Sequence, residues 1–138
     1  MNPKPVPEID DITRPFWEAV QRRTLELQRC DTCGTWIFYP TAWCTACYSH
    51  ALSWYPVSGR GSVYSYSVVH HPPFAAFSVD VPYVLATIEL EEGPHMMTNI
   101  VHCAHETVYV AMAVTVCFED RNGFLVPQFE PAPGVAGR

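Results

Sequence analysis

The sequence is poor in charge, and above all in positive charge. Charged residues make up 16% of the 138 residues, Lys and Arg together number 8, and the formal net charge is −6. A nucleic-acid-binding surface needs clustered Lys and Arg against the phosphates, so this composition argues against one. A monomer with so few charges is expected to expose apolar surface, which indicates a protein partner.

The chain also lacks long apolar runs. None is long enough to cross a bilayer. The opening residues, Met1-Asn2-Pro3-Lys4-Pro5, lack the apolar stretch of a signal peptide. Six cysteines are present, and four of them have metal-binding spacing, which suits a reducing compartment. We therefore expect a cytoplasmic protein without a membrane span.

Signatures of common catalytic sites are missing as well. No nucleophile elbow, phosphate loop or dinucleotide fingerprint appears. The fragment His102-Cys103-x-His105 has no fourth metal ligand nearby. Cys117 alternates with apolar neighbours, as a small core residue does. We assign no catalytic residue to this chain.

Two Cys-x-x-Cys pairs dominate what is present. Cys30 and Cys33 form the first pair, Cys44 and Cys47 form the second, and ten residues separate the pairs. Each pair predicts a knuckle, a tight turn that aims two thiolates at one point. Four sulfurs are the ligand set of a closed tetrahedral site for one zinc ion. The apolar residues between the pairs are expected to cover the metal and keep water from the sulfurs: Trp36, Ile37, Phe38, Tyr39 and Trp43.

Other uses of these four cysteines stay open on the sequence alone. They could form two disulfides, a redox-active dithiol or four plain thiols, and a rubredoxin-like iron centre has the same four-thiolate geometry. Zinc is favoured because nothing else in the chain indicates electron transfer. A closed four-thiolate site has no open position at which water is activated, so the motif predicts architecture rather than catalysis.

A short helix is expected before the first knuckle. Residues 1–10 hold three prolines and predict an extended arm. Thr13 is a candidate N-cap, with Pro15 in the first turn. Phe16, Trp17 and Val20 form one apolar stripe, which either packs on its own domain or docks on another subunit. Alternation over residues 24–29 predicts a strand that leads into the knuckle.

After the second knuckle, the pattern is one of short strands. Alternation and β-branched residues predict strands over residues 52–55, 62–70, 83–90, 95–101, 113–119 and 124–129. Asn122-Gly123 is a hairpin signal between the last two. Residues 74–81 are expected to form a loop. Such strands with almost no helix predict a small closed sheet, either an OB-type or an SH3-like barrel.

The order of these motifs resembles the family catalogued as domain of unknown function 35. The resemblance covers nearly the whole chain and is carried by Phe16-Trp17, the two knuckles with Tyr39-Pro40 between them, Gly59-Arg60-Gly61 before Val63-Tyr64-Ser65-Tyr66, Pro82-Tyr83, and Glu91-Glu92-Gly93. It implies a mainly β fold with an N-terminal helix and arm (1–29), a rubredoxin-like zinc ribbon (30–54), an OB-fold (55–131) and a tail (132–138).

Three positions depart from the family pattern. Thr45 stands where a proline usually follows the first cysteine of the second knuckle, and Ala42 stands where a basic residue is common. Ala111-Met112-Ala113 replaces a Gly-Met-Pro segment. All four cysteines are kept. The missing basic residue weakens a role for the ribbon in gripping a CoA phosphate.

The resemblance implies a non-catalytic accessory subunit. Family members assemble as hetero-oligomers with thiolases, thiolase-like aldolases of the lipid-transfer-protein type, or related acyl-CoA enzymes, including those of lipid or steroid side-chain degradation. The alternatives are a partner of an acyl-CoA hydratase and an OB-fold module that binds nucleic acid. A free-standing electron carrier is a further alternative.

The expected contacts with partner or substrate are aromatic and histidine side chains. His70 and His71 end a predicted strand, and they either reach a thioester or a partner's active site or make only local hydrogen bonds. The remaining candidates lie in the helix, the mid-chain loop and the start of the next strand: Phe16, Trp17, Phe74, Phe77 and Tyr83.

Overall fold

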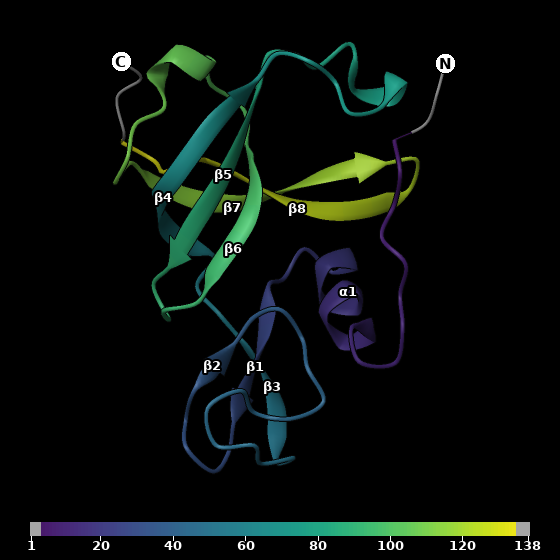
Figure 1. Cartoon of the computed structure of the whole chain (residues 1–138), viewed down its shortest axis with the longest axis vertical. Coiled ribbons are helices and arrows are strands. Elements are labelled where there is room, and N and C mark those ends of the chain that lie inside the picture. Colours follow the sequence, from purple (N-terminus) through teal and green to yellow (C-terminus); the bar gives the residue numbers. More distant parts are fainter. Residues whose placement is uncertain (1–3, 135–138) are drawn as a thin grey trace.

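The computed structural model describes residues 4–134 (Figure 1). The first three residues of the expected arm and the last four of the expected tail lie outside the described residues. The elements are α1 (Arg14–Gln21), β1 (Glu26–Cys30), β2 (Trp36–Ile37), β3 (Leu52–Pro56), β4 (Arg60–Val69), β5 (Tyr83–Leu90), β6 (His95–Ile100), β7 (Ala113–Arg121) and β8 (Phe124–Pro131), with short 3-10 helices η1 (Ala75–Phe77) and η2 (His105–Thr107). The prediction of a mainly β fold with one N-terminal helix is confirmed.

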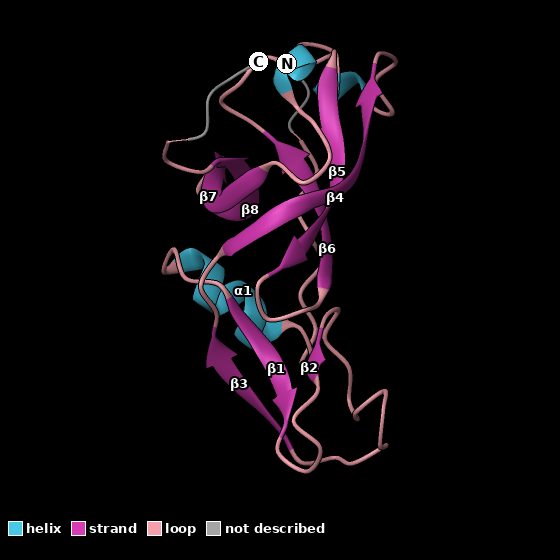
Figure 2. Cartoon of the chain, turned by 90° about the vertical axis from the view of Figure 1, so that its left-hand side faces the viewer, coloured by secondary structure: helices cyan, strands magenta, loops and turns pink. Residues whose placement is uncertain are grey.

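The strands form two sheets at opposite ends of the molecule (Figures 1 and 2). A small antiparallel sheet has the order β2-β1-β3 and carries the knuckles. A closed barrel has the order β4-β5-β6-β8-β7, and β7 pairs back to β4. β6 and β8 pair in parallel at Ile100 and Phe129, whereas the other barrel pairs are antiparallel. This is the arrangement of an OB-fold, so of the two expected barrels it is the OB type that forms.

The helix begins with a reciprocal pair of hydrogen bonds. The backbone N–H of Thr13 donates to Asp10 Oδ1 at 2.8 Å, and the backbone N–H of Asp10 donates to Thr13 Oγ1 at 3.1 Å. Thr13 is the first flanking residue of α1, as predicted, and Pro15 lies in the first turn. However, the Thr13 hydroxyl does not cap the helix from that position, since it points back to Asp10.

The apolar stripe of α1 is buried inside the chain. Phe16 is 1% exposed and Trp17 is 8% exposed, and their rings meet edge to face at 4.9 Å. The helix lies between the small sheet and the barrel, where it packs on β1 and β8 (Figure 1). Of the two expected uses of the stripe, packing on its own domain is therefore the one observed, because both side chains belong to the chain's core. A contact of Phe16 and Trp17 with another subunit stays a prediction.

One hydrophobic core joins the helix, β1 and the barrel. Leu25 and Leu27, which lead into the first knuckle, belong to the same cluster as Phe16 and the barrel residues Ile88 and Phe129. Along β5, buried and more exposed side chains alternate with the period of a strand. The two sheets consequently share a core through α1 and β1.

Glycine serves two purposes in the barrel: it forms one hairpin turn, and it lets two strands approach closely. Asn122 and Gly123 have φ values of 54° and 90° and connect β7 to β8, which confirms the predicted hairpin. At Gly61, a Cβ atom would lie 2.6 Å from the backbone oxygen of Glu89. Glycine at this position lets β4 and β5 approach closely.

Several boundaries differ from those expected. β4 starts at Arg60 rather than Ser62, because Arg60 pairs with Thr115 across the barrel closure. β8 runs on to Pro131, and β3 runs to Pro56, past the expected end of the ribbon at residue 54. Within residues 4–134, no helix is long and apolar enough to cross a membrane.

Candidate functional site

The four knuckle cysteines converge on one point. Their sulfur atoms all lie within 4.8 Å of one another, and two of the separations, Cys30 to Cys47 and Cys33 to Cys44, are 3.6 Å. A tetrahedral zinc ion about 2.3 Å from each sulfur sets the sulfurs about 3.8 Å apart. A disulfide requires about 2.0 Å, so these thiols are free and their spacing fits a metal site.

The thiols of this cluster differ in acidity. The pKa of Cys33 is lowered to about 6, because the hydroxyl and backbone of Thr35 hydrogen-bond to its sulfur. At Cys47, a backbone hydrogen bond from Ser49 lowers the pKa, but partial desolvation and the three neighbouring thiols outweigh it and raise the pKa to about 12. Four thiolates so close together repel one another unless a cation neutralises them, and a zinc ion supplies that charge.

Backbone amides also point at the knuckle sulfurs. The N–H of Cys33 lies 3.4 Å from the Cys30 sulfur, and those of Ala46 and Cys47 lie 3.3 and 3.5 Å from the Cys44 sulfur. Such donors stabilise thiolate ligands. The Cys-x-x-Cys spacing therefore places both the ligands and the amides that support them.

Gln28 is a buried supporting residue that the sequence reasoning missed. It is 5% exposed. Its amide nitrogen donates to the backbone oxygen of Thr41 at 2.9 Å, and its amide oxygen accepts from the Thr41 N–H at 2.8 Å. This bidentate clamp ties β1 to the loop between the knuckles. The alternation gave no signal for it, because Gln28 stands with Glu26 in the polar phase of the strand, opposite Leu25 and Leu27.

Only part of the expected apolar cover lies over the cysteines. Ile37 packs with Cys30 and Cys44, and Leu52 joins them. Trp36 and Phe38 pack on the main core instead. Tyr39 is 53% exposed and Trp43 is 50% exposed, and Cys33 and Cys47 are themselves exposed. The expectation that all five residues shield the sulfurs from water is therefore wrong, since the knuckle end has only a small core.

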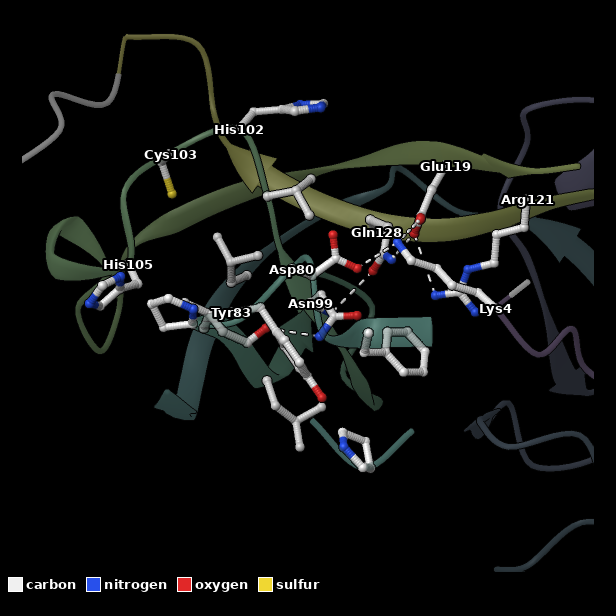
Figure 3. A pocket seen from close by; sticks show the side chains of 17 residues that line it. Lys4, Asp80, Tyr83, Asn99, His102, Cys103, His105, Glu119, Arg121 and Gln128 are labelled. Atoms are coloured by element: carbon white, nitrogen blue, oxygen red, sulfur yellow. Dashed lines mark hydrogen bonds and ion pairs between the residues drawn. The ribbon is translucent and has the colours of Figure 1, made fainter. Parts of the chain in front are cut away.

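A second candidate site is a cavity of about 470 Å³ on the barrel (Figure 3). The N-terminal arm, the loop from residue 73 to residue 83, the end of β6 and the strands β7 and β8 surround it. At one end, Lys4 Nζ lies 2.7 Å from Asp80 and 2.9 Å from Glu119. Arg121 also lies 3.4 Å from Glu119. The cavity therefore combines charged groups with apolar walls.

The ion pairs of this cavity perturb Glu119 and Lys4. Burial acts to raise the pKa of Glu119, but hydrogen bonds from Lys4 and Gln128 and the nearby Arg121 charge hold it below its usual value. Burial acts to lower the pKa of Lys4, but Asp80 and Glu119 raise it above its usual value. These groups stay charged at neutral pH and tie the arm to the barrel.

A second cavity, of about 360 Å³, adjoins the first. Four residues line both: Leu85, Asn99, Arg121 and Gln128. The second cavity continues toward the ribbon, where Tyr39 and Met97 border it and are 53% and 68% exposed. Together the two cavities form one groove from η2 to the ribbon, which we call the barrel groove.

The predicted contact residues separate into three groups. Phe16 and Trp17 are buried and line the second cavity of the barrel groove. Phe77 and Tyr83 line the barrel groove, with ring centroids 6.2 Å apart, and the exposed Phe74 lies against Phe77 at 6.1 Å. His70 and His71 are exposed outside the residues that line the groove, and the His70 ring lies 6.2 Å from that of His105. The structure thus gathers the aromatic candidates of the loop and sets the histidine pair apart.

Two family models match the sequence. Residues 17–53 match the rubredoxin-like zinc ribbon domain of ChsH2, and residues 54–119 match the C-terminal OB-fold domain of ChsH2. The first match and the convergence of the four sulfurs agree on a ribbon suited to one zinc ion.

Named relatives include subunits of enzymes and scaffold proteins. A probable enoyl-CoA hydratase alpha subunit of Thermomonospora curvata is 37% identical over 96% of this chain, but the chain spans only 40% of that protein. A DUF35 domain-containing scaffold protein of Methanocaldococcus jannaschii is 39% identical over 78% of this chain and 76% of its own length. A benzoylsuccinyl-CoA thiolase subunit of Geobacter metallireducens is 34% identical over 52% of this chain and 47% of its own length.

A solved structure also resembles the fold over its whole length. A chain of the Ltp2-ChsH2(DUF35) aldolase has a TM-score of 0.84 and 36% sequence identity, and the match covers 92% of this chain and 99% of that one. Since the ribbon model, the OB-fold model and the scaffold protein together match most of the sequence, the chain belongs to the DUF35 family.

Proposed function

We propose that this chain is a non-catalytic accessory subunit of an enzyme that acts on acyl-CoA thioesters. Its partner would be a thiolase-like subunit, either a thiolase or a retro-aldolase of the lipid-transfer-protein type. The two would form a hetero-oligomer in the cytoplasm, in a pathway of lipid or steroid side-chain degradation. The partner supplies the nucleophile and the acid and base groups.

The observation that carries this proposal is the match to the Ltp2-ChsH2(DUF35) aldolase. It covers nearly the whole of both chains at 36% identity, so it extends beyond a shared barrel type. Relatives named as a scaffold protein and as a thiolase subunit support the same kind of role. Fold alone would not carry a function, but similarity of this extent favours a shared mode of assembly.

The barrel groove is our candidate for the contact with partner and substrate. It is long and partly apolar, and exposed aromatic and methionine side chains lie along it. Tyr39 is 53% exposed and Met97 is 68% exposed within the groove, and Phe74, which is 59% exposed, packs on the groove residue Phe77. Aromatic and methionine side chains are typical of the buried centre of protein interfaces. A partner seated there would exclude water from a thioester held at its own active site.

Nucleic acid is not the proposed ligand. Five of the eight Lys and Arg residues are engaged in ion pairs with Asp or Glu: Lys4, Arg14, Arg22, Arg60 and Arg121. The net charge of −6 opposes binding to a phosphate backbone.

The proposal is tested by co-expression with the thiolase-like protein encoded nearest to this chain in its own genome. We expect the neighbour alone to be insoluble or inactive, and the pair to co-elute as a hetero-oligomer that acts on acyl-CoA. Met97→Ala should weaken the complex, because Met97 is 68% exposed and lines the groove. Val110→Ala is the matched control, because Val110 is 60% exposed and lines neither cavity of the groove. A neighbour that is fully active alone, with no co-elution at micromolar concentration, would overturn the proposal.

A second candidate is a partner of an acyl-CoA hydratase. The hydratase alpha subunit from Thermomonospora curvata favours it, since the match covers 96% of this chain. The products formed by the assembled complex distinguish the two candidate partners. A hydratase adds water to an enoyl-CoA, whereas a retro-aldolase or thiolase releases a shorter product.

A further inference from the structure

A second group of metal-ligand side chains lies at the end of the barrel away from the ribbon. The chain leaves β6 and turns at His102, whose φ is 63°. His102 then lies beside Cys117 on β7 and Glu130 on β8. In the β7–β8 register, Cys117 is opposite Gln128 and Thr115 is opposite Glu130. Cys117 and Glu130 are therefore diagonal neighbours on one face of the sheet.

The three donor atoms are close enough to share one ion. His102 Nδ1 lies 2.7 Å from Glu130 Oε1, and one donor atom each from His102, Cys117 and Glu130 all lie within 4.8 Å of one another. Ligands about 2.0–2.3 Å from a tetrahedral metal lie roughly 3–4 Å apart. Two of the donors come from adjacent strands of a closed barrel. The third comes from an exposed turn, and a bound ion would replace its hydrogen bond to Glu130.

We propose that His102, Cys117 and Glu130 bind one divalent transition-metal ion of borderline softness, with zinc as the physiological choice. An imidazole nitrogen, a thiolate and a carboxylate are all ligands that zinc accepts. Three protein ligands leave the fourth position for water or for a group of a bound partner. The His102 side chain is 67% exposed, so an ion reaches the site from solvent.

The surroundings of Cys117 favour a metal ligand over a nucleophile. Burial raises the pKa of the Cys117 thiol to about 12, and the charges of Glu130 and Glu119 add to the effect. A thiol held in its neutral form is a poor nucleophile. Binding of M²⁺ would release the thiol proton to solvent as the metal–sulfur bond forms, and the cation would offset the negative charge of the carboxylates.

The three potential metal ligands of residues 102–105 do not act together. Of His102-Cys103-x-His105, only His102 joins the three-residue group. All three residues line the barrel groove (Figure 3), but Cys103 and His105 lie outside the three-residue group, and His105 Nε2 lies 3.1 Å from Glu106. Cys103 is thus a natural control, as a second free thiol close in sequence that lies outside the proposed site.

The test uses untagged full-length protein loaded with a single equivalent of zinc, which the four-thiolate ribbon binds in preference to a three-ligand site, and Co²⁺ as the probe. Zinc keeps the ribbon filled, and Co²⁺ bound to a thiolate gives a charge-transfer absorption. We expect one saturable equivalent of Co²⁺ per chain with that absorption. Cys117→Ser should abolish the absorption and His102→Ala should weaken binding at least tenfold, whereas Cys103→Ser should bind like the wild type.

Three results would overturn the proposal. They are the absence of a saturable equivalent beyond the ribbon, a thiolate absorption that persists in Cys117→Ser, and His102→Ala binding that equals the wild type. Circular dichroism checks the fold of each variant. If Cys117→Ser does not fold, Co²⁺ binding to His102→Ala, a variant of an exposed residue, is by itself sufficient to test the proposal. The result does not depend on the proposed partner, because the isolated chain is measured.

Discussion

Single polar side chains hold together segments that are far apart in the sequence. Gln28 clamps the loop between the knuckles, and the Gln21 side chain bonds both backbone groups of Leu125 at 2.9 and 3.0 Å. Glu119 accepts from Lys4 and from Gln128 at 2.9 and 2.6 Å. Buried or half-buried polar groups of this kind are costly to remove, because their partners lose hydrogen bonds that water replaces poorly.

Gln28→Ala should destabilise the zinc-loaded protein by about 1–3 kcal/mol, since the N–H and C=O of Thr41 lose their partner. Release of zinc to a chelator should become faster as the loop loosens. Chemical denaturation and a competing zinc dye measure the two effects. Glu18→Ala, at an exposed position of α1, is the control and should change neither. Equal values for both variants would show that the clamp has no role.

Glu119→Gln should flatten the acid side of the stability profile. The folded state lowers the pKa of Glu119 below that of an ordinary glutamate, so its contribution to stability is present above the ordinary pKa and is lost as the pH falls through the folded pKa. Without the carboxylate this loss disappears, and the variant is less stable than the wild type at neutral pH. Chemical denaturation at several pH values between about pH 6 and pH 3 measures the free energy of unfolding of each protein, with Glu18→Gln as the control. Parallel profiles for wild type and Glu119→Gln would contradict the assignment.

At the scale of elements, α1 is the part that joins the two sheets. Its buried face packs on β1 and on β8, and Trp17 also meets the ring of Phe124 at 5.6 Å. A short helix of this kind is stabilised by its packing rather than by its own propensity. Damage at this face should therefore affect both sheets.

Trp17→Ala should cost about 3–5 kcal/mol, because it leaves a cavity at the junction of helix and barrel. Trp43→Ala should cost less than about 1 kcal/mol, since Trp43 is 50% exposed in the knuckle loop. Thermal unfolding of the two variants compares a buried with an exposed tryptophan. Similar midpoints would mean that α1 contributes little to the shared core.

Gly61→Ala tests the close approach of β4 and β5. The added Cβ would lie 2.6 Å from the Glu89 oxygen and 2.8 Å from Ile88 Cγ2, so the strands must separate. We expect a loss of about 1–3 kcal/mol. Ser62→Ala, at the next residue of the same strand, should stay within about 0.5 kcal/mol. A Gly61→Ala variant as stable as the wild type would show that the barrel adjusts without strain.

At the scale of the whole molecule, stability is divided unevenly between the two ends. The large core includes α1, β1 and the barrel, whereas the hydrophobic cluster at the knuckle end consists of Cys30, Ile37 and Cys44, with Leu52 packed against it. So small a cluster cannot order a long loop without help, and the four thiolates need a cation. The zinc ion is therefore the main stabiliser of the ribbon end.

Zinc removal should loosen residues 30–54 and leave the barrel folded. Hydrogen exchange after chelation should show faster exchange in the knuckles and unchanged protection in β4–β8. Cys33→Ser should reproduce this pattern, and Cys103→Ser, outside the knuckles, should not. Equal loss of protection along residues 4–134 would mean that zinc holds the whole fold through the shared core.

Local patterns in the sequence were enough to predict much of this protein. The Cys-x-x-Cys spacing placed the sulfurs, alternation placed β5 between residues 83 and 90, and Asn122-Gly123 placed a turn. These features depend on neighbours a few residues apart, through the period of a strand, the reach of a knuckle and the φ values of a turn. The family resemblance rested on the order of the same local motifs.

Tertiary structure decided which distant residues meet. Whether Phe16 and Trp17 face a partner or the core depended on where β8 lies, and the role of Gln28 depended on a loop beyond the first knuckle. The barrel groove and the group of His102, Cys117 and Glu130 exist only because β6 and β8 become neighbours when the barrel closes. Their residues carry no shared pattern along the chain, since the order of strands in a sheet, and not spacing in sequence, brings them together.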